Sequence, residues 1–541
     1  MEGQRDRSYR DTLTTAAVLS MILALAAALR VWGWEYGLPH PRARPDEEFV
    51  LGDVFQMFAQ NRWVPYRYTY PSLPIYVDVV ALRVYYYVGQ LLGHYDRILD
   101  MLFDIVVLRP GLHFRIVRTV SIVLGVGTVL ATYFVALFAW GKRRVALLAA
   151  LVTACSLLHV ITSRFGTVDC MMAFFVCWSL AFAVKAARDR KLSSFVLAGI
   201  LGGLATSSKY NAGTVCMALI LPVVAAMFSI EQRQRWPLFG KLVLAGVSMC
   251  LTFAVTSPYV ILSYEASLKE FAHIAQNLRG GSEVAILVHL RDTFRLGLGW
   301  PVYLAALAGV VRGLWRRQPV ELAMLGLLIP YMLMMVDVRV AYPRYVVPLV
   351  PVLAALSADI VMGVVARFRP YVAVLAASLL VTPTLWSSVQ FDRLAAQKDT
   401  RILATDWLGE NIERRAKIAV CEGYGAPKVN SDRRRPPAFE PIEIECAPPD
   451  VRDTGARYLI THEHPAFAQS LKHELQTMLA EEWKMLVRID PFHETSSAIP
   501  FFFRSDIFYL PMAGFDALER GGPIITVWAL DAVDDGRRGG S

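Results

Sequence analysis

Long apolar runs separated by short polar breaks occupy the chain from residue 12 to about residue 390. Their lengths are close to the roughly 17–25 residues that a helix needs to cross a bilayer. Such a helix satisfies its own backbone hydrogen bonds in lipid, where water is absent. The pattern predicts a polytopic α-helical membrane protein with about eleven spans, near 12–34, 114–140, 145–163, 170–187, 193–208, 214–230, 238–257, 297–311, 320–336, 346–365 and 371–390.

Lys and Arg are concentrated in every second break between these runs, and the other breaks are poorer in positive charge for their length. Cytoplasmic loops of membrane proteins carry such an excess. The alternation therefore predicts a cytoplasmic N-terminus and, with an odd number of spans, a C-terminus on the outer side of the cytoplasmic (inner) membrane. The clusters are Arg5 to Arg10, Lys142 to Arg144, Lys185 to Lys191, Arg233 to Lys241, Arg312 to Arg317, and Arg367 with Arg369.

Composition agrees with this class. Of the 541 residues, 55% are hydrophobic and 19% charged, which excludes a disordered chain, a collagen-like repeat and a small disulfide scaffold. The formal net charge is +9. Because the excess lies in the loops of one side, it indicates membrane topology and no nucleic-acid partner.

Two assignments stay open within this pattern. Residues 72–93 are apolar enough for a further span, but they carry Asp78 and Arg83 behind two prolines. We expect an amphipathic helix in the interface; if it crosses, a second crossing near 98–108 is needed to keep the charge alternation. The first span also has features of a signal peptide, but it is long for one, so we expect it to remain as a membrane anchor.

After residue 390 the long apolar runs stop and charged residues become frequent, which predicts a small soluble α/β domain at 391–541. The charge rule places this domain on the outer side. Residues 400–412 and 466–486 are expected to be helices, and 417–421, 457–461 and 524–530 strands, with 431–449 as a loop. Cys421 and Cys446 both lie in this domain. A disulfide between them is permitted in that compartment, but the spacing does not decide it.

Acids and bases from four separate turns fall at the predicted outer ends of the spans. Each alone is typical of a solvated loop or an interface anchor. Their joint presence on one side, beside an unusually long first outer loop (about 35–113), indicates a site at the membrane surface. The residues are Asp46, Glu47 and Glu48 in the long loop, Arg164 and Asp169 in the next outer turn, Lys209 and Tyr210 in the third, and Asp337, Arg339, Arg344 and Tyr345 in the fourth.

Four motifs in these turns together resemble the GT-C membrane glycosyltransferases. The resemblance is nearest to glycosyltransferase family 39 and its bacterial relatives, which include protein O-mannosyltransferases and the aminoarabinose transferase of lipid A. It covers nearly the whole chain, 1–390 as the transmembrane GT-C module and 391–541 as the outer domain. The motifs are Arg-Pro-Asp-Glu-Glu-Phe (44–49), Ser-Arg-Phe-Gly-Thr-Val-Asp (163–169), Ser-Ser-Lys-Tyr-Asn (207–211) and Arg-Tyr-Val-Val-Pro-Leu-Val-Pro (344–351).

The resemblance implies that a sugar moves from a polyprenyl-phosphate carrier to an acceptor on the outer face. Asp46 then corresponds to the proposed general base and Glu47 to the second member of the acid pair, while Asp169 and Lys209 match the acid and the lysine of the following loops. One departure is Thr-Tyr-Pro-Ser-Leu (69–73), where many bacterial relatives have Lys-Pro-Pro. A phosphate contact by that lysine must come from elsewhere, with Arg67, Arg164 and Arg344 as candidates.

The residue types also fit this chemistry by themselves. Transfer to a hydroxyl needs a base, and we assign Asp46 to it, with Glu48 as the rival and with Glu47 or Asp169 orienting the sugar. A departing phosphate needs cations more than an acid. A single base on the face of the sugar opposite to the leaving group implies inversion at the anomeric carbon. The candidate donor-binding residues are Lys209, Arg164, Tyr210, Arg344 and Tyr345.

The remaining functional expectations are broader. No cofactor is expected besides the lipid-linked donor, and a divalent metal between the carboxylates stays open. The acceptor is a protein, a glycolipid or a cell-wall glycan of the cell envelope. Two other classes compete: a transporter of a lipid or small solute, although we find no convincing internal repeat, and a lipid-linked oligosaccharide polymerase or ligase, which would use a diphosphate-linked donor.

Overall fold

The computed structural model describes residues 2–278, 284–429, 439–446, 451, 454–467, 473–503, 506 and 508–530. The chain divides into two compact units. Unit 1 contains Met1–Trp32, Phe49–Tyr85 and Ile116–Gln390, and unit 2 contains Gly33–Glu48, Tyr86–Arg115 and Phe391–Ser541. Segments of the long loop after the first span thus belong to the same unit as the C-terminal residues.

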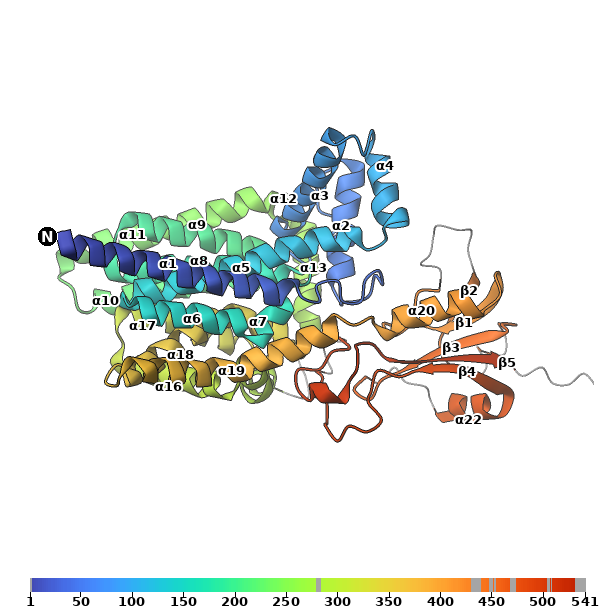
Figure 1. The fold of residues 1–541 in the computed structure, drawn as a ribbon. Helices are drawn as coiled ribbons and strands as arrows, with labels where there is room; N and C mark the ends of the chain where they lie inside the picture. The colour runs from blue at the N-terminus through green and yellow to red at the C-terminus, as the bar shows by residue number, and fades with distance from the viewer. Residues whose placement is uncertain are drawn as a thin grey trace, which may run out of the picture. The chain divides into compact units, whose positions relative to one another are not determined.

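Unit 1 is a bundle of roughly parallel and antiparallel helices (Figure 1). Seven segments in the described part of the chain are long and apolar enough to cross a membrane, and each corresponds to an expected span. The window in η4–α18 has 78% of its positions buried and those in α1 and α11 have 17% and 11%, so η4–α18 is central and the other two peripheral. The elements are α1 (Glu2–Val31), α5 (Leu112–Trp140), α8 (Val168–Asp189), η2 (Tyr210–Cys216) with α10 (Met217–Met227), α11 (Gln232–Thr256), η4 (Pro343–Leu349) with α18 (Val350–Val365), and α19 (Pro370–Ala395).

The other four expected spans correspond to shorter helices. One of them is broken at Ser156, whose backbone is extended. The break is tolerated because its polar groups find partners: the Ser156 hydroxyl donates to the Gly297 carbonyl at 3.0 Å, and the Leu157 amide donates to the Thr384 hydroxyl at 3.2 Å. The helices are α6 (Arg143–Cys155) with α7 (Leu157–Thr162), α9 (Leu192–Ser208), α16 (Trp300–Arg316) and α17 (Pro319–Leu333).

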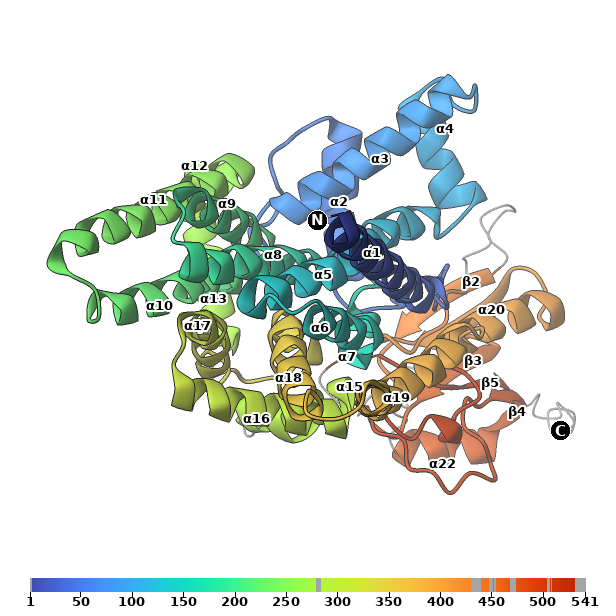
Figure 2. The same ribbon diagram turned by 60° about the vertical axis from the view of Figure 1, so that its left-hand side comes forward.

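Helices α9 and α11 lie side by side (Figures 1 and 2). Gly199 and Gly203 on α9 face the backbone of α11, where an added Cβ would collide with the carbonyls of Ala245 and Met249. Small residues allow helix backbones to approach this closely in membrane proteins. The packing therefore fixes the position of α9, whose end carries Lys209.

The basic breaks lie at the end of the bundle that holds the N-terminus of α1 (Figure 1). Hydrogen bonds join them there: Arg143 donates to Thr12 at 3.2 Å, and Lys241 donates to the Arg190 carbonyl at 2.8 Å. The turns that carry Asp169, Lys209 and Arg344 begin or end the same helices at the opposite end. Breaks that alternate along the sequence thus lie at alternate ends of the helix bundle.

Residues 73–91 form one helix, α3 (Leu73–Leu91), which is not among the seven candidate spans of the described residues. Within unit 1, α2 (Glu47–Gln60) and α3 run across the direction of the long helices (Figure 1). The remaining helices of unit 1 are α12 (Pro258–Leu262), α13 (Tyr264–Leu278), α14 (Ala285–Val288), η3 (His289–Thr293) and α15 (Phe294–Leu298); α4 (Ile98–Phe103) and η1 (Asp104–Leu108) belong to unit 2.

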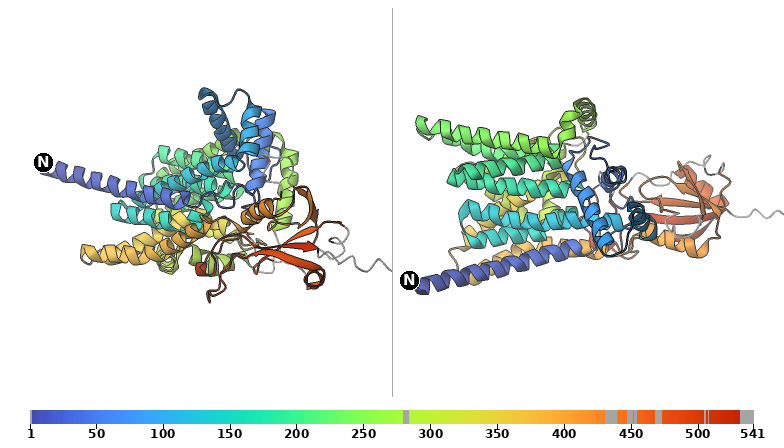
Figure 3. Two further views of the ribbon diagram at one scale, coloured as in Figure 1. Left: turned by 45° about the vertical axis from the view of Figure 1, so that its right-hand side comes forward. Right: turned by 90° about the horizontal axis from the view of Figure 1, so that it is seen from above.

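Unit 2 is built on a five-stranded sheet with the order β2-β1-β3-β5-β4. The β1–β2 and β1–β3 pairs are parallel, and the β3–β5 and β4–β5 pairs are antiparallel. Apolar residues of α20 pack in one cluster with the sheet and those of α22 in another, so the two helices cover opposite faces (Figure 3). The elements are β1 (Ala416–Cys421), β2 (Phe439–Ile444), β3 (Tyr458–Glu463), β4 (Trp483–Ile489), β5 (Ile524–Leu530), α20 (Thr400–Asn411), α22 (His473–Glu482) and η5 (Phe515–Ala517).

Two expectations for this unit are wrong at the sheet edges. Residues 439–444 of the expected loop form β2, and the helix expected to reach residue 486 ends at residue 482, where β4 begins. Both strands lie at an edge of the sheet. A proline in a local sequence pattern argues against a strand, but an edge strand such as β2 accepts Pro441. The local sequence of β4 is ambiguous between helix and strand, and its pairing with β5 decides for the strand.

Cys421 and Cys446 of this unit are joined by a disulfide.

A fully buried ion pair holds the loop before α2 against the sheet within unit 2. Arg401 donates to both carboxylate oxygens of Asp399, and its Nη1 donates to the carbonyls of Arg42 and Tyr424 at 3.0 and 2.9 Å. His40 lies beside it, with Nε2 2.9 Å from the Ala426 carbonyl and Nδ1 accepting from the Arg42 amide at 3.1 Å. Both ring nitrogens are satisfied only if His40 is neutral.

We expect unit 2 to lose stability as the pH falls below about 6.5. Burial, helped by the charge of Arg401, lowers the pKa of His40 to about 3, so the unfolded chain takes up a proton first. The stabilising neutral form is complete above the unfolded pKa and is lost progressively from about pH 6.5 towards about pH 3; at pH 5 the loss is about 2 kcal/mol. Hydrogen exchange of the β1–β5 amides, corrected for intrinsic rates, measures it.

His40→Gln should be less stable than the parent at pH 7.5. Its unfolding free energy should then fall less steeply with decreasing pH, because unfolding takes up about one proton fewer. His493→Gln is the matched control, because His493 is partly exposed and contacts only Glu519 among the described ion pairs. An unchanged slope in His40→Gln, or a flattened slope in His493→Gln, would contradict the assignment to His40.

Candidate active site

Asp169 is the centre of a buried charged cluster in unit 1. It lies in the first turn of α8, where the helix dipole favours a negative charge, and it is 1% exposed. Its Oδ1 accepts a hydrogen bond from Lys209 Nζ at 2.7 Å, and its Oδ2 lies 3.7 Å from Arg344 Nε. One carboxylate therefore binds two cations from two other segments of the chain.

Lys209 is positioned by the end of α9. The helix stops at Ser208, and Lys209 takes an extended backbone that turns its side chain towards α8. Its ammonium lies 4.4 Å from the centre of the Tyr345 ring and 5.8 Å from that of Tyr70. Aromatic faces attract a cation, so these two rings help to hold the ammonium in place.

Arg344 begins the segment that leads into α18. It lies in η4, is 5% exposed, and has its guanidinium 4.3 Å from the centre of the Tyr342 ring and 5.8 Å from that of Tyr345. The backbone here is anchored by Tyr331, which donates to the Tyr345 carbonyl at 2.8 Å and accepts from Asn211 at 2.9 Å. Residues of α17, η2 and η4 thus fix the two cations relative to each other.

A second polar group lies beside this cluster in unit 1. Tyr210, which follows Lys209, donates to the Tyr68 carbonyl at 3.0 Å, and Glu270 on α13 accepts from the Tyr68 amide at 2.7 Å. Arg67 lies 3.8 Å from Asp53 on α2. Burial raises the pKa of Asp53 to about 6. The negative charge of Glu270 adds to this rise, and the positive charge of Arg67 opposes it. Tyr68, next to the Thr-Tyr-Pro-Ser-Leu segment (69–73) that departs from Lys-Pro-Pro, is therefore held by α13 and η2.

Arg164 contacts the end of α1. It is fully buried, and its two terminal nitrogens donate to the carbonyls of Leu29 and Trp32 at 2.9 and 3.1 Å. The last carbonyls of a helix have no partner within it, so Arg164 satisfies the end of α1. These contacts argue for a structural role, and Arg164 is not included in the donor site proposed below.

The acidic motif belongs to unit 2. Asp46 is half-buried and precedes α2 with a φ of 71°, a left-handed conformation that Asp and Asn adopt more readily than other non-glycine residues. Glu47 is fully buried, whereas Glu48 pairs with Arg42 at 3.6 Å. Arg44 anchors the motif by a 2.7 Å bond to Asp506. Asp46 and Glu48, unlike Glu47, are thus partly exposed.

The structure brings Asp169, Lys209, Arg344 and Tyr345 into contact, as members of one cluster. Tyr210 is adjacent and bonded to the neighbouring segment, and Asp46 and Glu47 lie in the other unit. Sequence reasoning missed the aromatic and polar residues that hold the cluster, because no charge pattern marks them. These are Tyr70, Tyr342, Tyr331, Asn211 and Glu270.

One structural observation bears on metal binding. In the described part of the chain, no group of three or more His, Cys, Asp or Glu residues is arranged to hold a metal ion. Asp169 is bonded to an ammonium instead. We assign no metal ligand.

Comparisons with known proteins agree with this architecture. The family model described as dolichyl-phosphate-mannose-protein mannosyltransferase matches residues 105–261. No curated protein is similar enough to match the sequence. The matched family segment includes the turns that carry Asp169 and Lys209.

Three solved structures have a similar fold at low sequence identity. The apo oligosaccharyltransferase of Archaeoglobus fulgidus has 11% identity and a TM-score of 0.52, covering 95% of this chain and 88% of its own. ArnT from Cupriavidus metallidurans in the apo state has 13% identity and a TM-score of 0.51, covering 96% and 98%. Archaeal AglB from Archaeoglobus fulgidus, in complex with an inhibitory peptide and a dolichol-phosphate, has 13% identity and a TM-score of 0.50, covering 84% and 70%.

The fold is therefore that of the GT-C enzymes, a polytopic helical membrane module with a small α/β unit. The family model matches less than half of the chain, and the solved structures are similar in fold at 11–13% identity. This confirms the fold class expected from the sequence.

Proposed function

We propose that the chain transfers a single sugar from a polyprenyl-phosphate carrier to an acceptor hydroxyl, with inversion at the anomeric carbon. The observation that carries the proposal is the convergence of Lys209 and Arg344 on Asp169, at the end of the bundle opposite the basic loops. The similar AglB structure contains a dolichol-phosphate, which supports a lipid phosphate as the group that these cations bind.

The roles follow from the chemistry. Asp46 takes the proton of the acceptor hydroxyl, whose oxygen attacks the anomeric carbon while the bond from that carbon to the phosphate oxygen breaks. The lipid phosphate leaves with the electron pair, and Lys209 and Arg344 stabilise its charge. Asp169 keeps the two cations in place, and Tyr345 limits their movement. Glu47, the fully buried neighbour of Asp46 in the sequence, has an orienting role.

The reaction is proposed for the outer side of the cytoplasmic membrane. The basic loops at one end of unit 1 support a cytoplasmic position for that end. In a Cys250→Ala background, which removes an exposed thiol, we expect an impermeant maleimide to label Lys484→Cys on β4 in intact cells. Arg143→Cys, at the first residue of α6, should be labelled only after permeabilisation. The reverse pattern would contradict the topology.

The donor class is tested by transfer assays with purified full-length protein. The panel contains polyprenyl-monophosphate sugars, diphosphate-linked oligosaccharides and nucleotide sugars, and mass spectrometry identifies the products. We expect turnover only with a monophosphate-linked single sugar and an inverted product by NMR. Turnover only with a diphosphate-linked oligosaccharide would assign the chain to the polymerase or ligase class, and movement of an intact lipid without bond cleavage would assign it to transport.

A further inference from the structure

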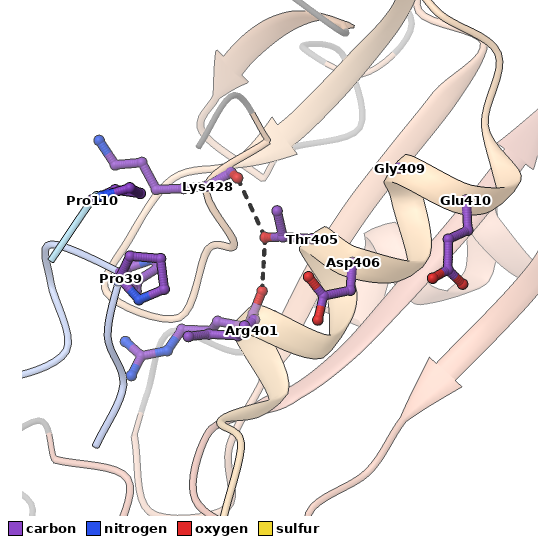
Figure 4. A pocket seen from close by; sticks show the side chains of 10 residues that line it. Pro39, Pro110, Arg401, Thr405, Asp406, Gly409, Glu410 and Lys428 are labelled. Atoms are coloured by element: carbon purple, nitrogen blue, oxygen red, sulfur yellow. Dashed lines mark hydrogen bonds between the residues drawn. The ribbon is translucent and has the colours of Figure 1, made fainter. Parts of the chain in front are cut away.

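Unit 2 contains a cavity of about 520 Å³ that the proposed reaction does not use. Its size falls within the range of ligand sites, about 300–1,000 Å³. It lies beside α20, between the loop before α2 and the segment after β1 (Figure 4). We call it the α20 cavity; it is lined by Pro39, His40, Pro110, Arg401, Ile402, Thr405, Asp406, Gly409, Glu410 and Lys428.

The floor of the α20 cavity is fixed before any ligand arrives. Arg401 and His40 are buried, and their contacts to Asp399 and to backbone carbonyls hold them in place. The Thr405 hydroxyl, which has one proton to donate, lies within hydrogen-bond distance of the carbonyls of Arg401 and Lys428, at 2.9 and 3.3 Å, and so links α20 to the opposite wall. A site with such fixed walls loses little entropy when it binds a ligand.

The accessible walls combine charges of both signs with small apolar surfaces. Asp406 and Glu410 are exposed, lie four residues apart, and project from the same side of α20, while Lys428 lies beyond Thr405 with the rings of Pro39 and Pro110 (Figure 4). Two carboxylates repel a phosphate or another anion. The apolar part is too small for a lipid chain, since Ile402 and two prolines supply it.

We propose that the α20 cavity binds a sugar residue of the acceptor, and that the acceptor is therefore a glycan. A sugar ring presents a C–H face, which suits the proline rings, and several hydroxyls. Asp406 and Glu410 accept charge-assisted hydrogen bonds from such hydroxyls, and Lys428 donates to their oxygens. The proposal rests on the proposed function, because it names the acceptor class of that reaction.

The loop that lines the cavity leads directly to the proposed base. Pro39 and His40 line the cavity, Arg42 accepts from Arg401 and pairs with Glu48, and Asp46 follows on the same loop. Burial raises the pKa of Glu48, and the charges of Arg42 and Lys428 oppose this rise while that of Asp46 adds to it. A ligand held by Lys428 is thus bound in the electrostatic surroundings of the acid motif, which favours an acceptor.

The test is binding without donor, so it does not depend on turnover. Full-length protein in detergent is applied to an array of neutral, amino-containing and acidic oligosaccharides together with Ser- and Thr-containing peptides. We expect binding to neutral or amino-containing oligosaccharides. Glu410→Gln and Asp406→Asn should each weaken it at least tenfold, and Gly409→Trp should abolish it, since a Cβ at Gly409 meets open space beside the cavity.

Two matched controls separate occupancy of the cavity from damage to the fold. Glu440→Gln removes an exposed carboxylate on β2 away from the cavity and should bind as the parent does, and Gly409→Ala, which leaves the cavity open, should bind more tightly than Gly409→Trp. Thermal unfolding of Gly409→Trp and Gly409→Ala should agree. Absence of oligosaccharide binding, binding to acidic sugars alone, binding that survives Gly409→Trp, or peptide binding that Gly409→Trp removes would each overturn the glycan assignment. Glycan binding by a protein that transfers no sugar would instead refute the proposed function alone.

Discussion

Asp46→Asn is expected to lower sugar transfer about 10²–10⁴-fold, the contribution typical of a positioned general base. The loss should appear in kcat, while binding of the lipid donor stays close to that of the parent. Asn is the informative replacement because Asp46 has a φ of 71°. Asn adopts this left-handed conformation readily, whereas Ala pays about 1–2 kcal/mol for it, so Asn removes the charge with the least disturbance of the backbone.

Glu48→Gln is the matched control, because Glu48 is the rival base and carries the same change of charge. It pairs with Arg42 on the solvent side of the motif, and we expect less than a tenfold loss. Full activity in Asp46→Asn together with a large loss in Glu48→Gln would move the base to Glu48.

The sequence predicts the helices of unit 1 well because run length alone decides whether a segment can cross a bilayer. The end of α9 at Ser208 and the start of α8 at Val168 agree with the expected spans to within two residues. The sharing of one end by Asp169, Lys209 and Arg344 follows from counting crossings. Their direct contact could not be predicted, because it depends on how α8, α9 and η4 pack.

Long-range contacts are where sequence reasoning fails. Arg164 has the composition and position of a phosphate ligand, yet it donates to backbone carbonyls at the end of α1, more than 130 residues away along the chain. Nothing near Arg164 in sequence distinguishes the two roles. The edge strands of unit 2 are missed for a similar reason: β2 contains Pro441, and only its place at the edge of the sheet makes that acceptable.

Lys209→Met is expected to reduce kcat/KM for the lipid donor by about 10²–10³, because one of the two cations that oppose the phosphate charge is removed. The effect should fall on donor use, with the KM for the acceptor little changed. The same variant also removes the 2.7 Å partner of Asp169, a carboxylate that is 1% exposed. Breaking such a pair costs about 3–5 kcal/mol, so lost activity alone does not separate a substrate contact from a structural one.

The double variant Asp169→Asn/Lys209→Met makes the separation. Removing both charges takes away the uncompensated carboxylate, so thermal stability should recover most of the loss. If Lys209 binds the donor phosphate, transfer stays low in this stable protein, and Lys209→Arg, which keeps the charge, retains part of it. If the pair is only structural, activity returns with stability. Recovery of both in the double variant would therefore remove Lys209 from the donor site and leave Arg344 to carry the phosphate.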